Sequence, residues 1–451
     1  MSIRGTVVKG IAKTSQTLLK KMTSGGSSFP GKLAKKLDPT ILGELAKDYD
    51  VIIITGTNGK TMTTSLAVNI LKQHYDHVLT NDTGSNLEQG ILSTFIGDKK
   101  PKHGRALAVL EVDEASVRHV TTYIKPKLIV ATNIFRDQMD RYGEIYTIYD
   151  FIREGAEKSP ETPLLLNGDA PIFSSEETPN PRLYFGFANQ DKTTDKLAHY
   201  NTDNVLCPIC DHLLHYHMIT YSNLGDYFCT NCGFHRPDLA YAVTSIDQLT
   251  PDSADFMLDG ENFHIPVAGV YNIYNALAAY AIARFFDVPI PLIRKGFETS
   301  ARVFGRQEVL DIAGKQVRIN LIKNPVGFNQ IVDIVSLQKS PFSLVVLLND
   351  RPADGQDVSW IWDGEFERLA ALSNNHAQII GGLRVKELRQ RMLVAGFDDA
   401  QLQTATDIPD VIDHIKAAKT PTVNILTTYT AMLDLRKALQ DQGIVKERMH
   451  A

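Results

Sequence analysis

The sequence predicts an α/β protein with two successive βα series and a small cysteine-bearing module inserted into the first. Short apolar runs alternate with polar, helix-compatible segments, which is typical of βαβ units around a mostly parallel sheet. The runs are 51–54, 106–111, 128–132 and 164–166 in the first series, and 317–321, 344–348, 377–380 and 423–426 in the second. The cysteines lie between 207 and 232, where the alternation is interrupted.

Composition narrows the class of protein. Hydrophobic residues make up 43% of the 451-residue chain and charged residues 22%, as in ordinary globular enzymes. The net charge of −5 creates no overall positive field that would attract nucleic acid. No apolar run is long enough to cross a bilayer, and no secretion signal follows the basic N-terminus. We therefore expect a cytoplasmic protein, and only four cysteines argue against a disulfide framework.

A glycine-rich loop follows the β-branched run 51–54 and has the sequence Gly56-Thr57-Asn58-Gly59-Lys60-Thr61. Its glycines allow a tight bend that turns backbone N–H groups toward an anion, Lys60 supplies a charge for the terminal phosphates, and the Thr61 hydroxyl can hold Mg²⁺. The usual spacing would place a glycine at 54, where this chain has Ile54. The alternative is an ordinary turn between strand and helix. We interpret the loop as a nucleotide phosphate site.

Polar side chains also follow the next strands. Glu111 and Glu114 come at the end of the run 106–111, where ligands bind in open α/β sheets, so both are candidates for Mg²⁺. The alternative is an acidic cap on the next helix. The charged segment 132–143 follows the run 128–132. An isolated cluster of this kind would be only a charged surface, but its position after a strand of the same sheet favours a functional role. Asn275 lies inside a predicted helix, where capping does not explain it.

The four cysteines form the pattern C-x2-C-x18-C-x2-C and are Cys207, Cys210, Cys229 and Cys232. Each pair can wrap a tight turn so that four thiolates enclose one Zn²⁺ ion in a closed, structural site. Four unrelated thiols or a redox pair are the alternatives. A zinc ribbon can bind nucleic acid, but few basic residues lie near this one.

Two aspartates, Asp354 and Asp357, lie in the turn that follows the run 344–348, close to both tryptophans of the chain. Turn chemistry alone explains such residues. A calcium loop is excluded because its spacing and distal glutamate are absent.

The order of these motifs resembles that of the Mur ligase superfamily, the ATP-dependent amide-forming enzymes of peptidoglycan assembly, and covers about 50–450. The motifs that carry the resemblance are Gly56–Thr61, Thr132-Asn133 with Asp137, Asn272 with Asn275, and Phe304-Gly305-Arg306. It accounts for Ile54, because the family loop is GTNGK[ST]. It implies that ATP phosphorylates a substrate carboxylate and that an amine attacks the acyl phosphate. In that scheme Lys60, Thr61 and Glu111 hold phosphates and Mg²⁺, Asn275 meets the adenine, and Arg306 reaches the nucleotide.

With these motifs we predict three parts: a basic helical segment at 1–47, a Mur-ligase-type ATP-binding domain at 48–302 with a zinc ribbon inserted at about 203–236, and a Rossmann-like domain at 303–451. The basic segment is either a solvated helix face or a contact with an anionic membrane surface or polyanionic substrate. The family histidine after Asp137 is replaced by Gln138, which questions a second Mg²⁺ site. The family Asp-Tyr-Ala-His-Asn-Pro motif is replaced by residues 320–325, Asn-Leu-Ile-Lys-Asn-Pro.

The zinc insertion, the segment 354–360 and Lys323-Asn324-Pro325 resemble one branch, the synthetase subunits of lipid II isoglutaminyl synthase. The resemblance implies amidation of the D-glutamate α-carboxylate of lipid II, at the inner membrane face, with ammonia from a GatD-type glutaminase partner. Because all four cysteines are assigned to zinc, no cysteine remains here to hydrolyse glutamine. The resemblance assigns Asp357 to the partner's catalytic histidine, although spacing alone does not separate it from Asp354. The alternatives are an amino-acid-adding ligase of the Mur or folylpolyglutamate type, and a nucleic-acid-binding regulatory ATPase.

Overall fold

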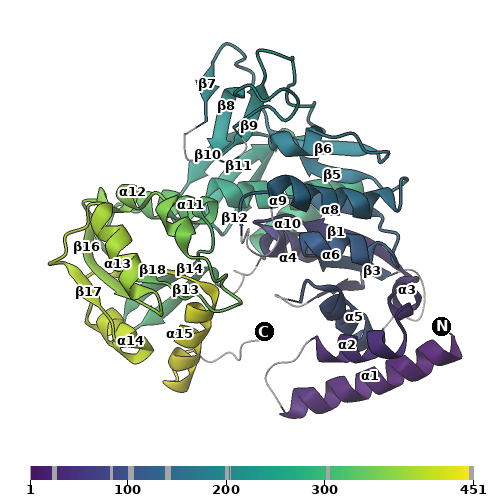
Figure 1. Ribbon diagram of the computed structural model, residues 1–451, viewed down its shortest axis with the longest axis horizontal. Helices are drawn as coiled ribbons and strands as arrows, with labels where there is room; N and C mark the ends of the chain where they lie inside the picture. The colour runs from purple at the N-terminus through teal and green to yellow at the C-terminus, as the bar shows by residue number, and fades with distance from the viewer. Residues whose placement is uncertain are drawn as a thin grey trace.

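The computed structural model contains two α/β bodies side by side, each built on its own sheet (Figure 1). The structure describes residues 2–22, 28–81, 85–99, 106–137, 144–198, 203, 205–300 and 305–445, without the side chains of 20–22 and 306. Within these residues, no helix combines the length and apolar character that a bilayer crossing requires.

The first body is organised on a nine-stranded sheet with the order β12-β11-β10-β6-β5-β4-β1-β3-β2. The strands from β2 to β10 pair in parallel, and β10, β11 and β12 form an antiparallel edge. The strands are β1 (Tyr49–Thr55), β2 (Val78–Thr80), β3 (Ala106–Glu111), β4 (Leu128–Ala131), β5 (Leu164–Asn167), β6 (Arg182–Phe187), β10 (Tyr241–Leu249), β11 (Ala254–Leu258) and β12 (Glu261–Ile265).

Strand β1 is the third strand from the β2 edge of this sheet, with β3 on one side and β4 on the other. The apolar run 51–54 is fully buried, as expected for a strand covered by helices on both faces. The helices are α4 (Lys60–Leu71), α5 (Glu88–Gly97), α6 (Glu114–Val120), α8 (Ile145–Glu157), η1 (Pro171–Ser174), α9 (Val270–Phe285) and α10 (Ile290–Glu298). Because the chain places its next strands on opposite sides of β1, the loop after β1 opens at a switch point of the sheet, where ligands bind.

The N-terminal segment forms three helices that share the core of the first body: α1 (Ile3–Met22), α2 (Phe29–Leu37) and α3 (Ile41–Ala46). Figure 1 shows α1 along the outer edge of the molecule, beside α2. Val8 and Ala12 of α1 and Ala34 of α2 are buried in that core. The segment is therefore packed through one face of each helix.

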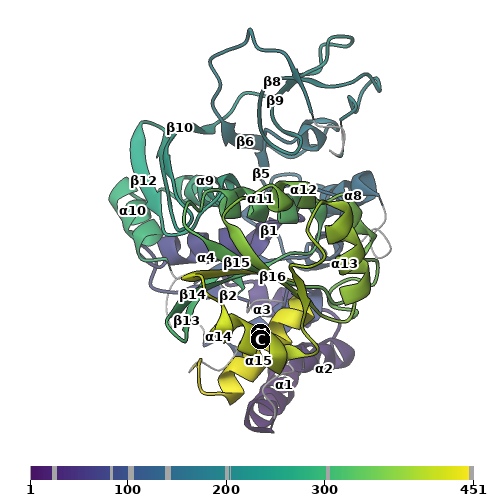
Figure 2. The same cartoon turned by 90° about the vertical axis from the view of Figure 1, so that its left-hand side faces the viewer.

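The cysteine module forms a separate three-stranded antiparallel sheet of β7 (Lys196–Leu197), β8 (His215–Tyr221) and β9 (Leu224–Phe228). It enters the chain between β6 and β10 and projects from the end of the molecule opposite α1 (Figure 2). Its small core contains Tyr216 and Tyr227 together with Cys207 and Cys229.

The second body has a six-stranded sheet with the order β13-β14-β18-β15-β16-β17, parallel except for the β13–β14 hairpin. Its strands are β13 (Arg306–Ile312), β14 (Lys315–Leu321), β15 (Phe342–Leu347), β16 (Asn375–Gly381), β17 (Leu402–Thr404) and β18 (Thr422–Thr427). Its helices are α11 (Pro325–Ser336), η2 (Ser359–Trp362), α12 (Phe366–Ala370), α13 (Val385–Val394), α14 (Ile408–Ala417) and α15 (Tyr429–Asp441).

The predicted fold class is confirmed, and each apolar run used to predict it coincides with a strand, although the runs 128–132 and 344–348 each extend one residue beyond theirs. Within the two large sheets, the sequence analysis did not identify strands β2, β6, β11, β12, β13 and β17. The core of the first body extends from Val8 to Phe297, and the cores of the second lie almost wholly beyond Ile312. The boundaries at 47/48 and 302/303 remain predictions.

Candidate active site

The glycine-rich loop connects β1 to α4 and adopts a conformation that only glycine accommodates at two positions. Gly56 has φ +123° and Gly59 has φ +88°, in the region that L side chains rarely adopt. A Cβ atom on Gly59 would lie 2.1 Å from Oδ1 of Asn275, and one on Gly56 would lie 2.4 Å from Oγ1 of Thr132. The loop is therefore closely packed between α9 and the end of β4.

Residues at the end of β4 form hydrogen bonds with the backbone of the loop. The backbone N–H of Asn58 donates to Oδ1 of Asn133 at 2.8 Å, and the carbonyl of Asn58 accepts from Oγ1 of Thr132 at 2.8 Å. Thr57 is buried and bonds through its hydroxyl to the backbone of Phe135. The segment 132–143, predicted to be functional, thus begins by holding the phosphate loop in shape.

Lys60 lies where the loop becomes α4, with its ammonium group surrounded by acceptors. Nζ donates to the carbonyl of Gly56 at 2.5 Å and to Oε1 of Glu114 at 3.0 Å. Burial alone would lower the pKa of Lys60, but the carboxylates of Glu114, Glu111 and Asp113 outweigh burial and raise it. Burial would raise the pKa of Glu114, but Lys60 and Lys323 hold it below its ordinary value. Both groups are charged at neutral pH, as a phosphate-binding lysine requires.

The predicted Mg²⁺ ligands are Thr61, which follows Lys60 in α4, and Glu111, which ends β3. Thr61 lines the cavity described below. Glu111 ends β3 and is buried, with its backbone bonded twice to Asn81 and Oε1 accepting from Asn86 at 3.4 Å. Oxygen donors of this kind suit Mg²⁺, which usually takes one or two protein ligands and completes its shell with phosphate oxygens and water. The residues present therefore fit the ion.

A cavity opens from the loop between the two bodies. Asn275 and Tyr221 line it from the first body, and Asn320 and Gln330 from the second. The Oδ1 atom of Asn320 is buried and has no hydrogen-bond partner among the described residues. Because a buried acceptor without a donor is costly, this atom suits the hydroxyl or amino group of a nucleoside. The polar groups that line the cavity therefore suit a nucleotide.

The structure describes the two predicted nucleotide-binding residues Arg306 and Asn275 to different extents. Arg306 begins β13, paired with Asn320 across the hairpin, and its neighbours Gly305 and Gln307 line the cavity. The side chain of Arg306 lies outside the described residues, as does Gln138 with the hypothesis of a second Mg²⁺ site. Asn275 donates to Oδ1 of Asn272 at 3.0 Å. Because its Oδ1 atom lies directly against Gly59, Asn275 contacts the phosphate loop as well as the cavity.

Polar contacts hold the second body against the loop. Lys323 Nζ and Asp137 Oδ2 form an ion pair at 2.5 Å. Just beyond it, Asn324 caps α11 and exchanges amide hydrogen bonds with Asn58 at 3.2 and 3.4 Å. The Asn320–Pro325 segment, which differs from the family motif, thus places a lysine next to the carboxylates around Lys60.

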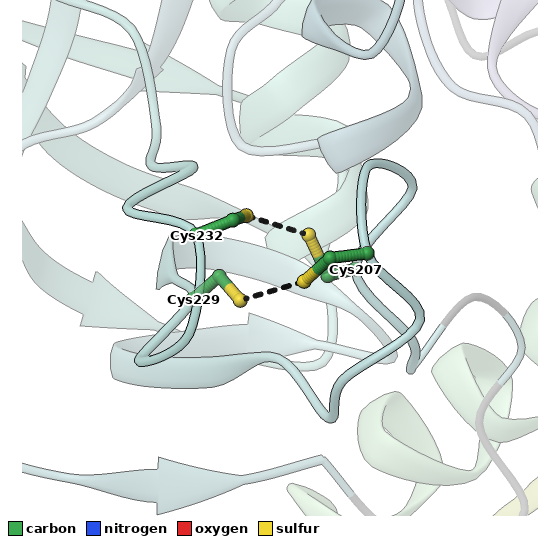
Figure 3. Close-up of side chains that lie close together, drawn as sticks. Cys207, Cys229 and Cys232 are labelled. Atoms are coloured by element: carbon green, nitrogen blue, oxygen red, sulfur yellow. Dashed lines mark hydrogen bonds between the residues drawn. The ribbon is translucent and has the colours of Figure 1, made fainter.

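The four cysteines converge as predicted, and Figure 3 shows the sulfur atoms of Cys207, Cys229 and Cys232 pointing toward one another. Their sulfur atoms all lie within 4.8 Å of one another, with 3.6 Å between Cys207 and Cys232 and 3.5 Å between Cys210 and Cys229. Among the described residues this is the only cluster of three or more Cys, His, Asp or Glu ligand atoms. Four sulfur donors at such distances fit a tetrahedral Zn²⁺ ion.

A fully buried aspartate, Asp169, connects the cysteine module to α9. Its carboxylate accepts from the hydroxyl of Tyr274 at 2.6 Å, from Arg236 at 2.7 Å and from the backbone N–H of Phe187 at 2.8 Å. Tyr274 also bonds to Thr220 of β8 at 2.8 Å. Since Tyr274 precedes Asn275, one hydrogen-bond network joins the module to a helix of the cavity wall.

The two candidate aspartates after β15 have different environments. Asp354 is buried and accepts from the backbone N–H of Thr430 at 2.7 Å and from the N–H of Arg351 at 3.1 Å. Asp357 is exposed, and its carboxylate accepts from the N–H and the hydroxyl of Ser359 at 2.8 and 2.9 Å. These bonds lower the pKa of Asp357, so it is ionised at neutral pH. The carboxylate of Asp354 is therefore hydrogen-bonded to residues of its own body, whereas that of Asp357 is exposed at the surface.

Sequence reasoning did not identify three of the contributors to this site: Lys323 as a bridge between bodies, Asp169 as a hub and Tyr221 as a cavity residue. Lys323 was visible as a departure from the family motif. Asp169 and Tyr221 carried no local signal, because each acts through partners distant in sequence.

The comparisons agree with this geometry. The family model for the Mur ligase middle domain matches residues 54–283, and the one for the MurT ligase C-terminal region matches 321–432. The MurT subunit of lipid II isoglutaminyl synthase from Streptococcus pneumoniae is 45% identical over 450 residues, the full length of both chains. The same subunit from Staphylococcus aureus strain COL is 35% identical over 85% of this chain and 86% of its own length. MurF ligase from Thermotoga maritima, solved with ADP, has the same fold, with a TM-score of 0.64, 15% identity, and 91% of this chain and 85% of its own covered.

The fold, the phosphate loop and the cavity between two bodies define an ATP-dependent ligase of the Mur type, a class that uses ATP and Mg²⁺. Within it, the chain belongs to the MurT family.

Proposed function

We propose that this protein amidates the D-glutamate α-carboxylate of the lipid II stem peptide to D-isoglutamine, using ATP and ammonia from a glutaminase subunit. The observation that carries the proposal is the position of Lys60 at the junction of the two bodies, paired with Glu114 and close to Lys323. The full-length relative is named as a subunit of an enzyme that performs this synthesis with glutamine hydrolysis.

The chemistry follows from the charges around the loop. A carboxylate is a poor electrophile until one oxygen becomes part of a phosphate leaving group. Transfer of the ATP γ-phosphoryl group yields an acyl phosphate and ADP, and attack by ammonia at the carbonyl carbon then forms the amide and releases phosphate. Lys60 and Mg²⁺ held by Thr61 and Glu111 would balance the charge of the transferring phosphoryl group. Arg306 and Asn275 are assigned to nucleotide binding.

Nitrogen supply requires a second chain in this proposal, because the cysteines of this one form the four-sulfur cluster. Asp357 is exposed and ionised, so a GatD-type glutaminase can dock over it. There Asp357 would orient the partner's catalytic histidine, as the third member of a Cys-His-Asp arrangement does. A lipid-linked substrate places this heterodimer at the inner face of the cytoplasmic membrane.

We propose that the ion held by Cys207, Cys210, Cys229 and Cys232 is Zn²⁺ with a structural role, because four thiolates close the coordination shell. Metal analysis of the purified chain should find one zinc per chain, and Cys229→Ser should reduce both the zinc content and the melting temperature. A chain that purifies metal-free with an unchanged melting temperature would contradict this assignment.

The test of the function is mass spectrometry of lipid II after incubation with the chain, a GatD-type glutaminase, ATP and glutamine. Amidation lowers the substrate mass by about 1 Da and should require all components. A parallel reaction replaces glutamine and the glutaminase with amino acids. Addition of an amino-acid residue there, without amidation in the first reaction, would instead establish an amino-acid-adding ligase of the Mur or folylpolyglutamate type.

A further inference from the structure

Helix α1 presents an apolar stripe on its outer face. Ile3, Val7, Ile11 and Leu18 are exposed by 88%, 56%, 47% and 56%. At 3.6 residues per turn their positions fall within an arc of about 80°, so they lie along one side of the helix, with Thr14 between Ile11 and Leu18. Large apolar side chains grouped in this way mark an interaction surface.

The opposite face of α1 is fixed to the body of the protein, so the stripe cannot turn inward. Val8 and Ala12 are buried, and a Cβ atom on Gly5 would lie 2.2 Å from Oε2 of Glu44. The N–H of Ser2 also donates to Glu44 at 3.0 Å. One face of α1 is therefore packed against the first body, while the apolar strip on the opposite face stays exposed.

Helix α2 lies against α1 and also exposes large apolar side chains. Phe29 and Leu37 are exposed by 51% and 39%, and Lys32 and Lys36 are exposed on the same helix. Arg4 of α1 donates to the carbonyl of Leu37 at 2.8 Å, which ties the end of α2 to the start of α1. We call this two-helix face, formed by the exposed residues of α1 and α2, the N-terminal face.

The N-terminal face differs in charge from the rest of the protein. The first 37 residues contain eight Lys and Arg and no Asp or Glu. With a whole-chain net charge of −5, the remaining residues carry −13. An anionic bilayer would attract the positive N-terminal residues and repel the negatively charged rest of the protein. This separation of charge therefore favours a bilayer over a protein partner.

We propose that the N-terminal face binds directly to an anionic lipid bilayer, with Ile3, Val7 and Ile11 inserted among the acyl chains and the lysines beside the headgroups. An apolar strip flanked by lysine and arginine on a helix too polar to span is the pattern of an interfacial helix. The strip has no acidic neighbour within α1 or α2 that would oppose insertion. This inference does not depend on the proposed reaction.

The test measures co-sedimentation of the full-length chain with vesicles of phosphatidylglycerol and phosphatidylcholine, and with pure phosphatidylcholine. Val7→Gln with Ile11→Gln removes the centre of the strip, and Lys13→Gln with Lys36→Gln removes two exposed charges. The matched controls are Leu383→Gln with Val394→Gln, both exposed by 58%, and Lys419→Gln with Lys437→Gln, both exposed, all in the second body. Melting temperature and ADP binding verify that each variant is folded.

We expect the wild-type chain to bind the anionic vesicles and to release from them as salt is raised. The apolar pair should lower the partition coefficient by about tenfold or more. The lysine pair should lower it by roughly 10- to 30-fold on anionic vesicles only. The control pairs should leave it within about twofold.

Equal binding to both kinds of vesicle, no binding to either, or unchanged binding by the apolar pair would overturn the proposal. If the apolar pair instead dissolves a self-association or a glutaminase complex of the chain and leaves vesicle binding unaltered, the N-terminal face binds protein, and the proposal is again overturned. Amidation of detergent-solubilised lipid II should be retained by both test pairs. A failure of the proposed reaction is thereby separated from a failure of bilayer binding.

Discussion

At the scale of single residues, the site depends on which charges the fold places around Lys60. Its ammonium group contacts Glu114 at 3.0 Å, and both groups are largely buried. A buried lysine without carboxylates nearby would lose its charge, so the acidic residues after β3 keep Lys60 cationic for phosphate. The loop supplies the lysine, but a different strand keeps it charged.

The first prediction concerns Lys60→Ala. The variant should lose amide synthesis by on the order of 100-fold or more, because a charge stabilising the transferring phosphoryl group is removed. The loss should be equal with glutamine and with ammonium, since phosphoryl transfer precedes the use of either. Product formation measured by mass spectrometry checks both conditions. Lys72→Ala, at the exposed end of the same helix, is the control and should retain activity.

The second prediction concerns Asp357→Asn. Synthesis driven by glutamine should fall by on the order of 1,000-fold, because an amide cannot hold a histidine in the required tautomer and charge state. Synthesis driven by added ammonium should stay within about twofold of wild type, since the phosphate loop is untouched. Asp398 is an exposed aspartate that accepts from the N–H two residues later, at 3.0 Å, as Asp357 does. Asp398→Asn should change neither rate, and equal loss of both rates in Asp357→Asn would contradict the assigned role.

At the scale of elements, the cysteine module is part of the cavity wall through α9. Tyr274 donates to the buried carboxylate of Asp169, and burial together with that carboxylate raises the pKa of Tyr274 well above its ordinary value. The phenol therefore remains protonated and a hydrogen-bond donor at neutral pH. A four-sulfur module at one end of the sheet is thereby coupled to the helix that carries Asn275.

The third prediction tests that coupling with Tyr274→Phe. The variant leaves Asp169 short of one donor and should destabilise the first body by about 1–3 kcal/mol. Hydrogen exchange should accelerate in both β8 and α9, and the melting temperature should fall. Tyr146→Phe changes an exposed tyrosine of α8 and serves as the control. Faster exchange confined to α9 would show that the module is held independently of the hydroxyl.

At the scale of the whole molecule, the active site exists only where the two bodies meet. Asn58 and Asn324 exchange hydrogen bonds, and Lys323 reaches Asp137 across the same boundary. A second ion pair joins Arg136 to Asp363 at 2.5 Å. These contacts are partly exposed, so each adds little to stability, but together they define the geometry around the phosphate loop.

The fourth prediction concerns Lys323→Met. Synthesis should fall on the order of 10- to 100-fold with either nitrogen source, because the second body is no longer oriented on the loop. The equal effect on glutamine and ammonium separates Lys323 from Asp357. The melting temperature should change little. Lys315→Met removes a lysine at the start of the same strand-and-helix unit and should retain activity. A loss seen only with glutamine would assign Lys323 to the partner interface instead.

The sequence by itself determined the α/β class, the phosphate loop and the cysteine cluster, because each depends on residues that are close in the chain. The geometry of the phosphate loop at Gly59 and Lys60 and of the C-x2-C pairs is local, so the spacing of these residues along the chain predicts it. The tertiary structure alone decided that Lys323 faces Asp137, that Asp169 joins the module to α9, and that Asp354 is buried while Asp357 is exposed. Each of these depends on contacts between segments that are distant in sequence. A local pattern of residues does not predict which distant side chain will be the contact partner.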